Sequence, residues 1–310
     1  MIVVLFIVSL LVFLLTNFIG DPVDMLVPEN ATLEQIESAR PRLGLDKPLP
    51  VQYGIFIRDV LHGNFGKSYI YGKPAMDLIF ERMPATLELV AVAACLVLCI
   101  AIPLGVYAGA YPKRASSKLI MSGSILGISL PSFWVGMMMI YIFAVVLRLL
   151  PASGRGNTVM VGNVALSIFA PGGIRYVILP AITLALTNVA TMLRLTRSGI
   201  LENMRQDYIK FARAKGVPAK SILFGHALKN ALIPVVTIFG MDLGNMIAFT
   251  TITETIFAWP GMGKLLIDAI NKSDRPIIVA YLMAAACMFV VLNFIVDILY
   301  TLIDPRIELR

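Results

Sequence analysis

The sequence predicts an all-α integral membrane protein with about six transmembrane helices. The first observation behind this prediction is composition: 58% of the residues are hydrophobic, only 15% are charged and the mean hydropathy is +0.83. An ordinary soluble domain has about 45–50% apolar and about 25% charged residues. The second observation is that the apolar residues form long blocks separated by short polar stretches, which is typical of helices surrounded by lipid.

Six apolar blocks are each long enough, at about 1.5 Å per residue, to cross a hydrocarbon core about 30 Å thick. They lie at about 1–19, 86–111, 119–150, 176–193, 231–253 and 277–303. No small-residue cleavage site follows the first block, because the chain continues Gly20-Asp21-Pro22, so we expect a retained anchor. Within the long third block, the pair Gly123 and Gly127 together with Pro131 and Pro151 predicts a bend or a tilt.

The basic loops predict the orientation of the chain. The loop 112–118 carries Lys113, Arg114 and Lys118 and no acid, and the loop 194–230, called the basic loop below, carries eight Lys or Arg residues against Glu202 and Asp207. Both lie on one side of a six-span topology, so that side is expected to be cytoplasmic, together with both termini.

The chain is expected to divide after residue 85. Residues 1–85 form the first transmembrane helix and a small extracytoplasmic segment, and residues 86–310 form a five-helix core. Within the extracytoplasmic segment we expect one helix capped by Thr32 or Asn30 and another from Gln52 to His62.

The basic loop is too long to be a simple connection and predicts a helix–turn–helix. Its first helix is expected to end at Gly216, its second to begin near Pro218, and Pro234 to mark the next span. Such a unit, with a basic face and with Ile222, Leu223 and Phe224 available for a partner's cleft, is suited to docking in the cytoplasm. The alternative is a basic amphipathic hairpin that lies on anionic lipid headgroups.

The residue order in the basic loop favours docking. Ala212-Arg213-Ala214-Lys215-Gly216, followed by the stretch from His226 to Pro234, resembles the permease subunits of ABC importers, specifically the dipeptide/oligopeptide/nickel branch. Of the generic importer pattern, Glu-Ala-Ala, three residues and Gly, only Ala212 and Gly216 fit, and this departure is typical of that branch. The resemblance covers almost the whole chain, with further matching stretches at 20–22, 43–53, 63–68, 84–89, 129–134, 179–181, 254–263 and 304–306.

The resemblance implies that the basic loop couples this chain to an ATP-binding subunit, whose closure would move the spans. The residues it assigns to this coupling role are Asp207, Tyr208, Ala212, Arg213, Ala214, Lys215, Gly216, Val217, Ser221, Leu223, His226, Asn230 and Pro234. The chain itself contains no Gly-x4-Gly-Lys-Ser/Thr phosphate loop, so it is expected to be no enzyme and to bind no cofactor, with ATP and Mg used by partner subunits.

The resemblance also implies cargo, partners and location. The expected cargo is di- and oligopeptides, with nickel or a nickel chelate as the alternative. The expected partners are a homologous permease subunit in a heterodimer, two ATP-binding cassette subunits and an extracytoplasmic solute-binding protein; membrane lipid surrounds the chain and no nucleic acid is involved. The expected location is the bacterial or archaeal cytoplasmic (inner) membrane, as a multi-pass protein.

A second candidate region is the outer segment from Glu254 to Gly263. It is interpreted as a gate or as a contact for the binding protein, and the alternative is a loop packed at the membrane interface with Trp259 as an anchor. The residues considered are Glu254, Phe257, Trp259, Pro260, Gly261 and Gly263.

Asp242 is the one acid at plausible membrane depth, which makes it a possible intramembrane polar site. The alternative is a polar contact between helices, with Asn245 as a candidate partner. Asp297 is expected in a structural salt bridge. His62 and His226 lie on opposite sides of the membrane in this topology, so no metal site is expected.

Two other function classes fit the sequence less well. An ion-coupled secondary transporter should carry several ionisable residues at mid-membrane depth, whereas Asp242 is nearly alone. A membrane-embedded enzyme would need a paired-carboxylate, Ser/His or metal constellation on facing spans, and the sequence offers none.

Overall fold

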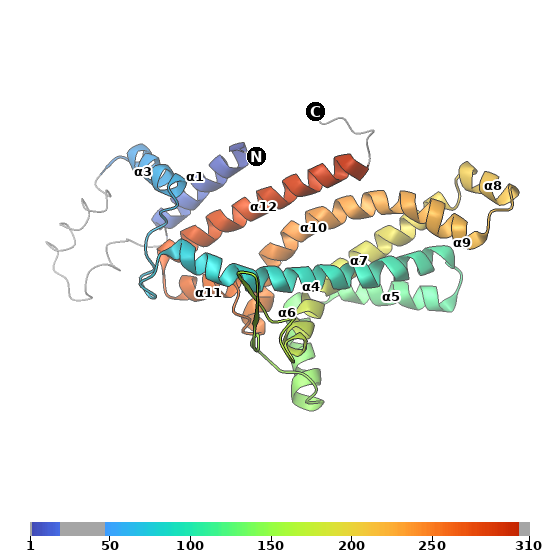
Figure 1. Cartoon of the computed structure of the whole chain (residues 1–310), viewed down its shortest axis with the longest axis horizontal. Coiled ribbons are helices and arrows are strands. Elements are labelled where there is room, and N and C mark those ends of the chain that lie inside the picture. The colour runs from blue at the N-terminus through green and yellow to red at the C-terminus, as the bar shows by residue number, and fades with distance from the viewer. Residues whose placement is uncertain (1, 19–46, 304–310) are drawn as a thin grey trace. The chain divides into compact units, whose positions relative to one another are not determined.

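The computed structural model of the chain describes residues 2–18 and 47–303, and the regular secondary structure of this part is helical apart from one β-hairpin and an isolated bridge (Figure 1). The expected helix at Thr32, the matching stretches at 20–22 and 304–306 and part of that at 43–53 lie outside the described residues, as does the side chain of Asp297. The elements are α1 (Ile2–Phe18), α3 (Leu49–Leu61), α4 (Ala75–Ala110), α5 (Ala115–Ser129), α6 (Ser132–Met139), η1 (Ile140–Val146), β1 (Val159–Val161), β2 (Val164–Leu166), α7 (Ile174–Asn203), α8 (Asp207–Ala214), α9 (Ala219–Ser221), η2 (Ile222–Ala227), α10 (Leu228–Ile256), α11 (Met262–Asn271) and α12 (Arg275–Ile303).

The chain forms two compact units. The first unit comprises Met1–Pro84 and Pro260–Val290, and the second comprises Ala85–Trp259 and Val291–Arg310. Residues 260–290, which the sequence places in a five-helix core, therefore belong to the unit that contains the N-terminal segment.

The long apolar helices agree with the predicted membrane protein. Four helical stretches in the described part are long and apolar enough to cross a bilayer, and the bent pair α5–α6/η1 makes a fifth if it counts as one span. A shorter apolar helix lies at Val3–Leu15. These six apolar segments match the six predicted blocks, although the shortest would need a thin or adapted bilayer.

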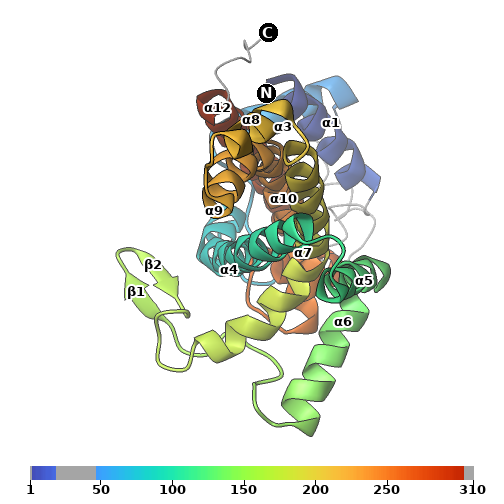
Figure 2. The same ribbon diagram turned by 90° about the vertical axis from the view of Figure 1, so that its right-hand side faces the viewer.

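The predicted bend in the third block is confirmed. The helical segments on either side of Leu130 and Pro131 meet at 105° (Figure 2). Leu130 is extended, with φ −90° and ψ 131°, because the ring of a following proline disfavours helical backbone, and Pro131 then becomes the N-cap of α6.

Pro234 does not mark the beginning of a span. It lies inside α10, and Ala219–Ile256 is one continuous helical stretch that includes the π-helical turn η2. Proline is tolerated within transmembrane helices because neighbouring helices and local changes of helical pitch satisfy the freed backbone carbonyl. The corresponding prediction from the sequence was therefore wrong.

The hairpin β1–β2 was not predicted. Its strands pair antiparallel with Val161 opposite Val164, so the loop has only two residues, Gly162 and Asn163. Gly162 has φ +62°, the conformation that two-residue hairpin loops require at this place.

In the first unit, α1 packs on α3 and α11 packs on the beginnings of α4 and α12. The Tyr53 hydroxyl lies 2.9 Å from Ser9 Oγ, and the rings of Tyr53 and Phe13 meet edge to face at 5.4 Å. Ile79, Met262 and Ile277 are fully buried where the other three helices meet. Helix α3 confirms the helix predicted from Gln52 to His62.

In the second unit, α4 and α7 approach closely over two glycines. A Cβ atom on Gly105 would lie 2.6 Å from Thr196 Cβ, and one on Gly109 would lie 2.7 Å from Ile200 Cβ. The four-residue spacing of these glycines is the small-residue pattern that lets transmembrane helices pack backbone to backbone. This contact holds the last turns of α7, with which the basic loop begins.

Candidate functional site

The basic loop forms the predicted helix–turn–helix. Helix α7 extends to Asn203, α8 follows, and the chain reverses at Gly216 before α9 and η2 lead into α10. Gly216 has φ +75°, a left-handed conformation that glycine adopts without steric cost, and a Cβ atom there would meet nothing within 4 Å. The turn therefore needs glycine for its backbone and not for space.

One face of the loop is buried. Ile209 and Ile222 are buried and pack with Ile200 and Ala231 in one apolar cluster. Ile222 is therefore part of the interior and is not available to a partner, contrary to the sequence-based expectation, and Leu223 is only partly exposed. The burial fixes the loop against the ends of α7 and α10.

A polar contact fixes the loop in addition. The Tyr208 hydroxyl donates to Asn203 Oδ1 at 2.8 Å and accepts from Asn230 Nδ2 at 2.9 Å. Tyr208 thereby joins α8 to the last turn of α7 and the first turn of α10. Tyr208 and Asn230 were predicted as site residues, whereas Asn203 was not.

The other face of the loop is aromatic and basic. Phe211 is 62% exposed and Phe224 is 58% exposed, and the Lys215 ammonium lies 4.5 Å from the centre of the Phe211 ring. Lys210 Nζ lies 2.8 Å from Asp207 Oδ1, and this hydrogen-bonded cation lowers the pKa of the Asp207 carboxyl. The exposed members of the predicted set are Asp207, Tyr208, Arg213, Ala214, Lys215, Gly216, Ser221, His226, Asn230 and Pro234, and the partly buried members are Ala212, Val217 and Leu223.

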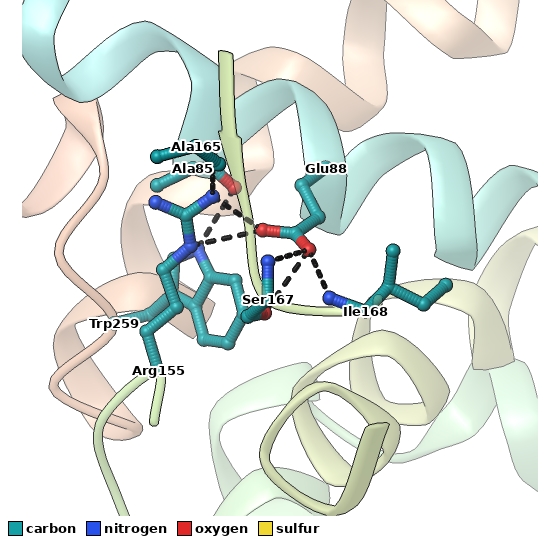
Figure 3. A network of polar contacts seen from close by, with 7 residues as sticks. All are labelled: Ala85, Glu88, Arg155, Ala165, Ser167, Ile168 and Trp259. Carbon is teal, nitrogen blue, oxygen red and sulfur yellow. Dashed lines mark hydrogen bonds and ion pairs between the residues drawn. The ribbon is translucent and has the colours of Figure 1, made fainter. Parts of the chain in front are cut away.

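A second site in the same unit is a buried ion pair (Figure 3). Arg155 donates from Nε at 2.9 Å and from Nη2 at 2.5 Å to Glu88 Oε2, and these side chains are only 11% and 2% exposed. The other carboxylate oxygen, Oε1, accepts from the backbone N–H groups of Ser167 and Ile168 at 2.6 and 2.7 Å and from the Ser167 hydroxyl at 3.0 Å. Arg155 also donates to the carbonyl of Ala165 in β2 at 2.6 Å. A buried pair is tolerated when its remaining hydrogen-bonding groups are satisfied in this way.

Of the predicted gate residues, Trp259 contacts this pair, and both Trp259 and Glu254 are buried. Trp259 is fully buried, its Nε1 donates to the carbonyl of Ala85 at 2.8 Å, and Arg155 lies 5.8 Å from the centre of its ring. Glu254 is also fully buried and accepts from the Thr86 hydroxyl at 2.7 Å. Trp259 is therefore an internal packing residue and no exposed interfacial anchor.

The remaining predicted gate residues offer little surface either. Phe257, Gly261 and Gly263 are buried and Pro260 is partly buried, whereas Ala258 is exposed. Contact with a binding protein would therefore have to use backbone or exposed neighbours, and the gate interpretation stays a prediction.

Glu88 and Arg155 were missed as site residues. The signal for Glu88 was present: an acid near the beginning of an apolar block calls for a partner, as Asp242 does. Arg155 lies 67 residues further along the chain, in a glycine-rich stretch, and only the fold brings the two together.

Asp242 lines a cavity of about 340 Å³ between α6, α7 and α10. Ser132, Thr183, Asn188 and Asn245 line the same cavity. Asn245 interacts with the Asp242 carboxyl, but it lies three residues further along α10, so this contact is not one between helices. In the part of the chain that the structure describes, no group of three or more His, Cys, Asp or Glu side chains is arranged to hold a metal ion.

Two family models match the chain. The model described as "Binding-protein-dependent transport system inner membrane component" matches residues 101–309, and the model of the corresponding N-terminal region matches residues 1–90. The basic loop, the cavity and most of the ion-pair network lie in the first of these ranges.

Several relatives are similar over nearly their whole length. The chain is 39% identical to the di/tripeptide transport system permease protein DppB of Pseudomonas aeruginosa, over 97% of this chain and 94% of that protein. It is 37% identical to the probable D,D-dipeptide transport system permease protein DdpB of Escherichia coli, over 97% and 92%. It is 38% identical to the oligopeptide transport system permease protein AppB of Bacillus subtilis, over 93% and 90%.

A solved structure shares the fold. A chain of the methionine ABC transporter MetNI, in an inward-facing conformation, superposes with a TM-score of 0.57 at 16% identity, covering 74% of this chain and 97% of that one.

Proposed function

Since the chain belongs to the family of binding-protein-dependent transport system inner membrane components, we propose that it lines the path by which an ATP-driven importer moves di- and oligopeptides across the membrane. The family confirms the resemblance deduced from the sequence: the chain is a multi-pass permease subunit of an ABC importer. The proposed peptide cargo is supported by the similarity to relatives that are named as dipeptide and oligopeptide permeases, at 37–39% identity. The same names favour peptides over nickel.

The basic loop is proposed as the element that receives the force of ATP hydrolysis. Its apolar inner face and the Tyr208 contacts make it a stiff extension of α7 and α10, and its outer face presents Phe211, Phe224 and several cations. A stiff element pushed by a partner transmits motion to the helices it continues, whereas a loose loop would absorb it. Exposed cations and aromatic rings would also suit a lipid surface; the family match over residues 101–309, which include this loop, favours docking on a cassette subunit.

The partners follow from this role. We infer a second, homologous permease subunit, two ATP-binding cassette subunits and an extracytoplasmic solute-binding protein. ATP and Mg²⁺ would be bound by the cassette subunits, and this chain would carry no cofactor of its own. The positive excess of the basic loop supports a cytoplasmic position for it, with both termini on the same side of the cytoplasmic membrane.

The test expresses the chain with its partner subunits in a leucine-requiring host that lacks its own peptide permeases. Growth on a leucine-containing dipeptide, and recovery of cassette subunits with the tagged chain in mild detergent, are the expected results. Phe211→Ser should abolish both. Phe169→Ser is the matched control, because Phe169 is 66% exposed and lies outside the basic loop, and it should change neither. Failure of the wild-type chain to support growth, with all subunits present, would contradict the proposed cargo.

A further inference from the structure

The cavity at Asp242 is polar although it lies between membrane-spanning helices. Helices α7 and α10 both fall within stretches long and apolar enough to cross a bilayer, and Asp242 lies near the middle of α10. A carboxylate at such depth is costly unless it faces water, a partner charge or a ligand. A volume of about 340 Å³ lies within the range of about 300–1,000 Å³ that is usual for small-molecule sites.

The polar lining is rich in hydrogen-bond acceptors. Three side chains of α7 that face the cavity donate their protons to the backbone carbonyl four residues earlier, at 2.9, 3.2 and 3.2 Å; they are Thr183, Asn188 and Thr191. A threonine hydroxyl whose proton is used in this way keeps only acceptor capacity, whereas Asn188 keeps its carbonyl oxygen and one amide N–H. These oxygens face the same space as the Asp242 carboxylate.

The cavity has a negative charge without a balancing cation. The described residues that line it include no Lys, Arg or His, and in the described part of the chain no ion pair involves Asp242. A ligand that brings positive charge, with donors for the α7 oxygens, therefore suits this cavity. A primary ammonium has one positive charge and three donors and accepts nothing, so it matches this lining.

We propose that this cavity binds the protonated α-amino group of the transported peptide, with Asp242 as its anionic partner and the α7 oxygens as acceptors. The proposal rests on the proposed function and names the chemistry by which the path recognises its cargo. The carboxyl end of the peptide is repelled by Asp242, so the peptide enters with its amino end toward α10. Met246 and Phe249 line the same cavity, and flexible or aromatic apolar side chains suit cargo whose own side chains vary.

Photo-crosslinking tests the site directly. The complete transporter in nanodiscs of phosphatidylcholine and phosphatidylglycerol is illuminated with a diazirine-containing dipeptide, either with a free amino terminus or N-acetylated. Mass spectrometry should map the free dipeptide to α7 and α10, with labelling at least tenfold above the acetylated form. Asp242→Asn should reduce labelling by the free dipeptide to the acetylated level, because it keeps the shape and removes the charge.

Uptake by the same transporter gives the second readout. Asp242→Asn should lower peptide uptake at saturating peptide and binding protein at least tenfold, with assembly of the complex unchanged, and Asp242→Glu should restore part of it. Asp268→Asn is the matched control: Asp268 pairs with Lys264 at 2.8 Å in the first unit and should tolerate the change.

The outcomes separate the two proposals. A wild-type transporter that moves no peptide contradicts the proposed function. If Asp242→Asn leaves peptide uptake and labelling unchanged, only the proposed site for the α-amino group is overturned. Equal labelling by free and acetylated dipeptides also overturns it. Phosphatidylethanolamine carries the same ammonium, and if adding it to the nanodiscs displaced the dipeptide label while uptake stayed normal, the site would belong to lipid and the peptide assignment would be wrong.

Discussion

Replacing Arg155 with methionine removes the cation from the buried pair with Glu88 and keeps much of the side-chain volume. In the described part of the chain, Arg155 is the only cation paired with this carboxylate. The variant leaves Glu88 Oε2 without the two donors at 2.9 and 2.5 Å, whereas Oε1 keeps its three donors from Ser167 and Ile168.

The expected loss of stability depends on the hydrogen bonds that Glu88 keeps in the variant. Removing one partner of a buried ion pair costs about 3–5 kcal/mol, because the other charge stays buried without compensation. Because Glu88 keeps three donors, Arg155→Met should lower the free energy of unfolding by about 3 kcal/mol, the lower end of this range. Glu88→Gln in the same background removes the stranded charge, so the double variant should be more stable than Arg155→Met alone.

Tryptophan fluorescence during unfolding in sodium dodecyl sulfate measures this free energy. The chain has two tryptophans, so a Trp134→Phe background leaves Trp259, beside the pair, as the reporter. Arg175→Met is the matched control, since the exposed Arg175 side chain donates to the carbonyl of Leu149 and its replacement should cost about 0.5–1.5 kcal/mol at most. An Arg155→Met variant as stable as this control, with no coupling to Glu88→Gln, would refute the structural role of the pair.

Three further predictions concern the packing and the basic loop. Gly109→Leu should reduce the yield of folded protein in size-exclusion chromatography, because overpacking against Ile200 costs about 1–3 kcal/mol, whereas Gly123→Leu, with open space around it, should not. Gly216→Val should impair uptake several-fold at normal membrane insertion, since a left-handed β-branched residue costs about 1–2 kcal/mol, and Gly216→Asn should be milder; equal uptake by all three forms would contradict the role of this turn. Tyr208→Phe should weaken co-purification of the cassette subunits several-fold, because it removes two hydrogen bonds worth about 1 kcal/mol each that hold the loop; recovery of the cassette subunits equal to that with the wild-type chain would contradict it.

Local patterns in the sequence predicted the local features of the fold. The apolar blocks predicted the spans, because a helix that crosses lipid needs a long uninterrupted apolar run. Pro131 predicted the bend, because a proline restricts the backbone of the residue directly before it. The turn at Gly216 was predictable for the same reason. Pro234 was misread because membrane helices accommodate prolines that would end a helix in water.

Long-range contacts were not predictable in this way. Burial of Ile222 and Trp259 depends on which helices face each other, and the chain gives no local sign of it. The pairing of Glu88 with Arg155 joins residues of opposite charge far apart in sequence, and several other arginines were equally plausible partners. Asp242 and its neighbour Asn245 could be picked out from the sequence alone, whereas the acceptors of α7 that line the same cavity became visible only in the fold.

ATP-dependent uptake of a radiolabelled dipeptide into proteoliposomes that contain this chain, its partner permease and the cassette subunits tests the importer assignment most directly. With binding protein outside and ATP inside, uptake should exceed the level without ATP by at least tenfold, and it should fall to that level when Phe211→Ser removes the exposed ring of the basic loop. Uptake that needs no ATP and follows an imposed proton or sodium gradient would contradict the assignment and favour an ion-coupled transporter.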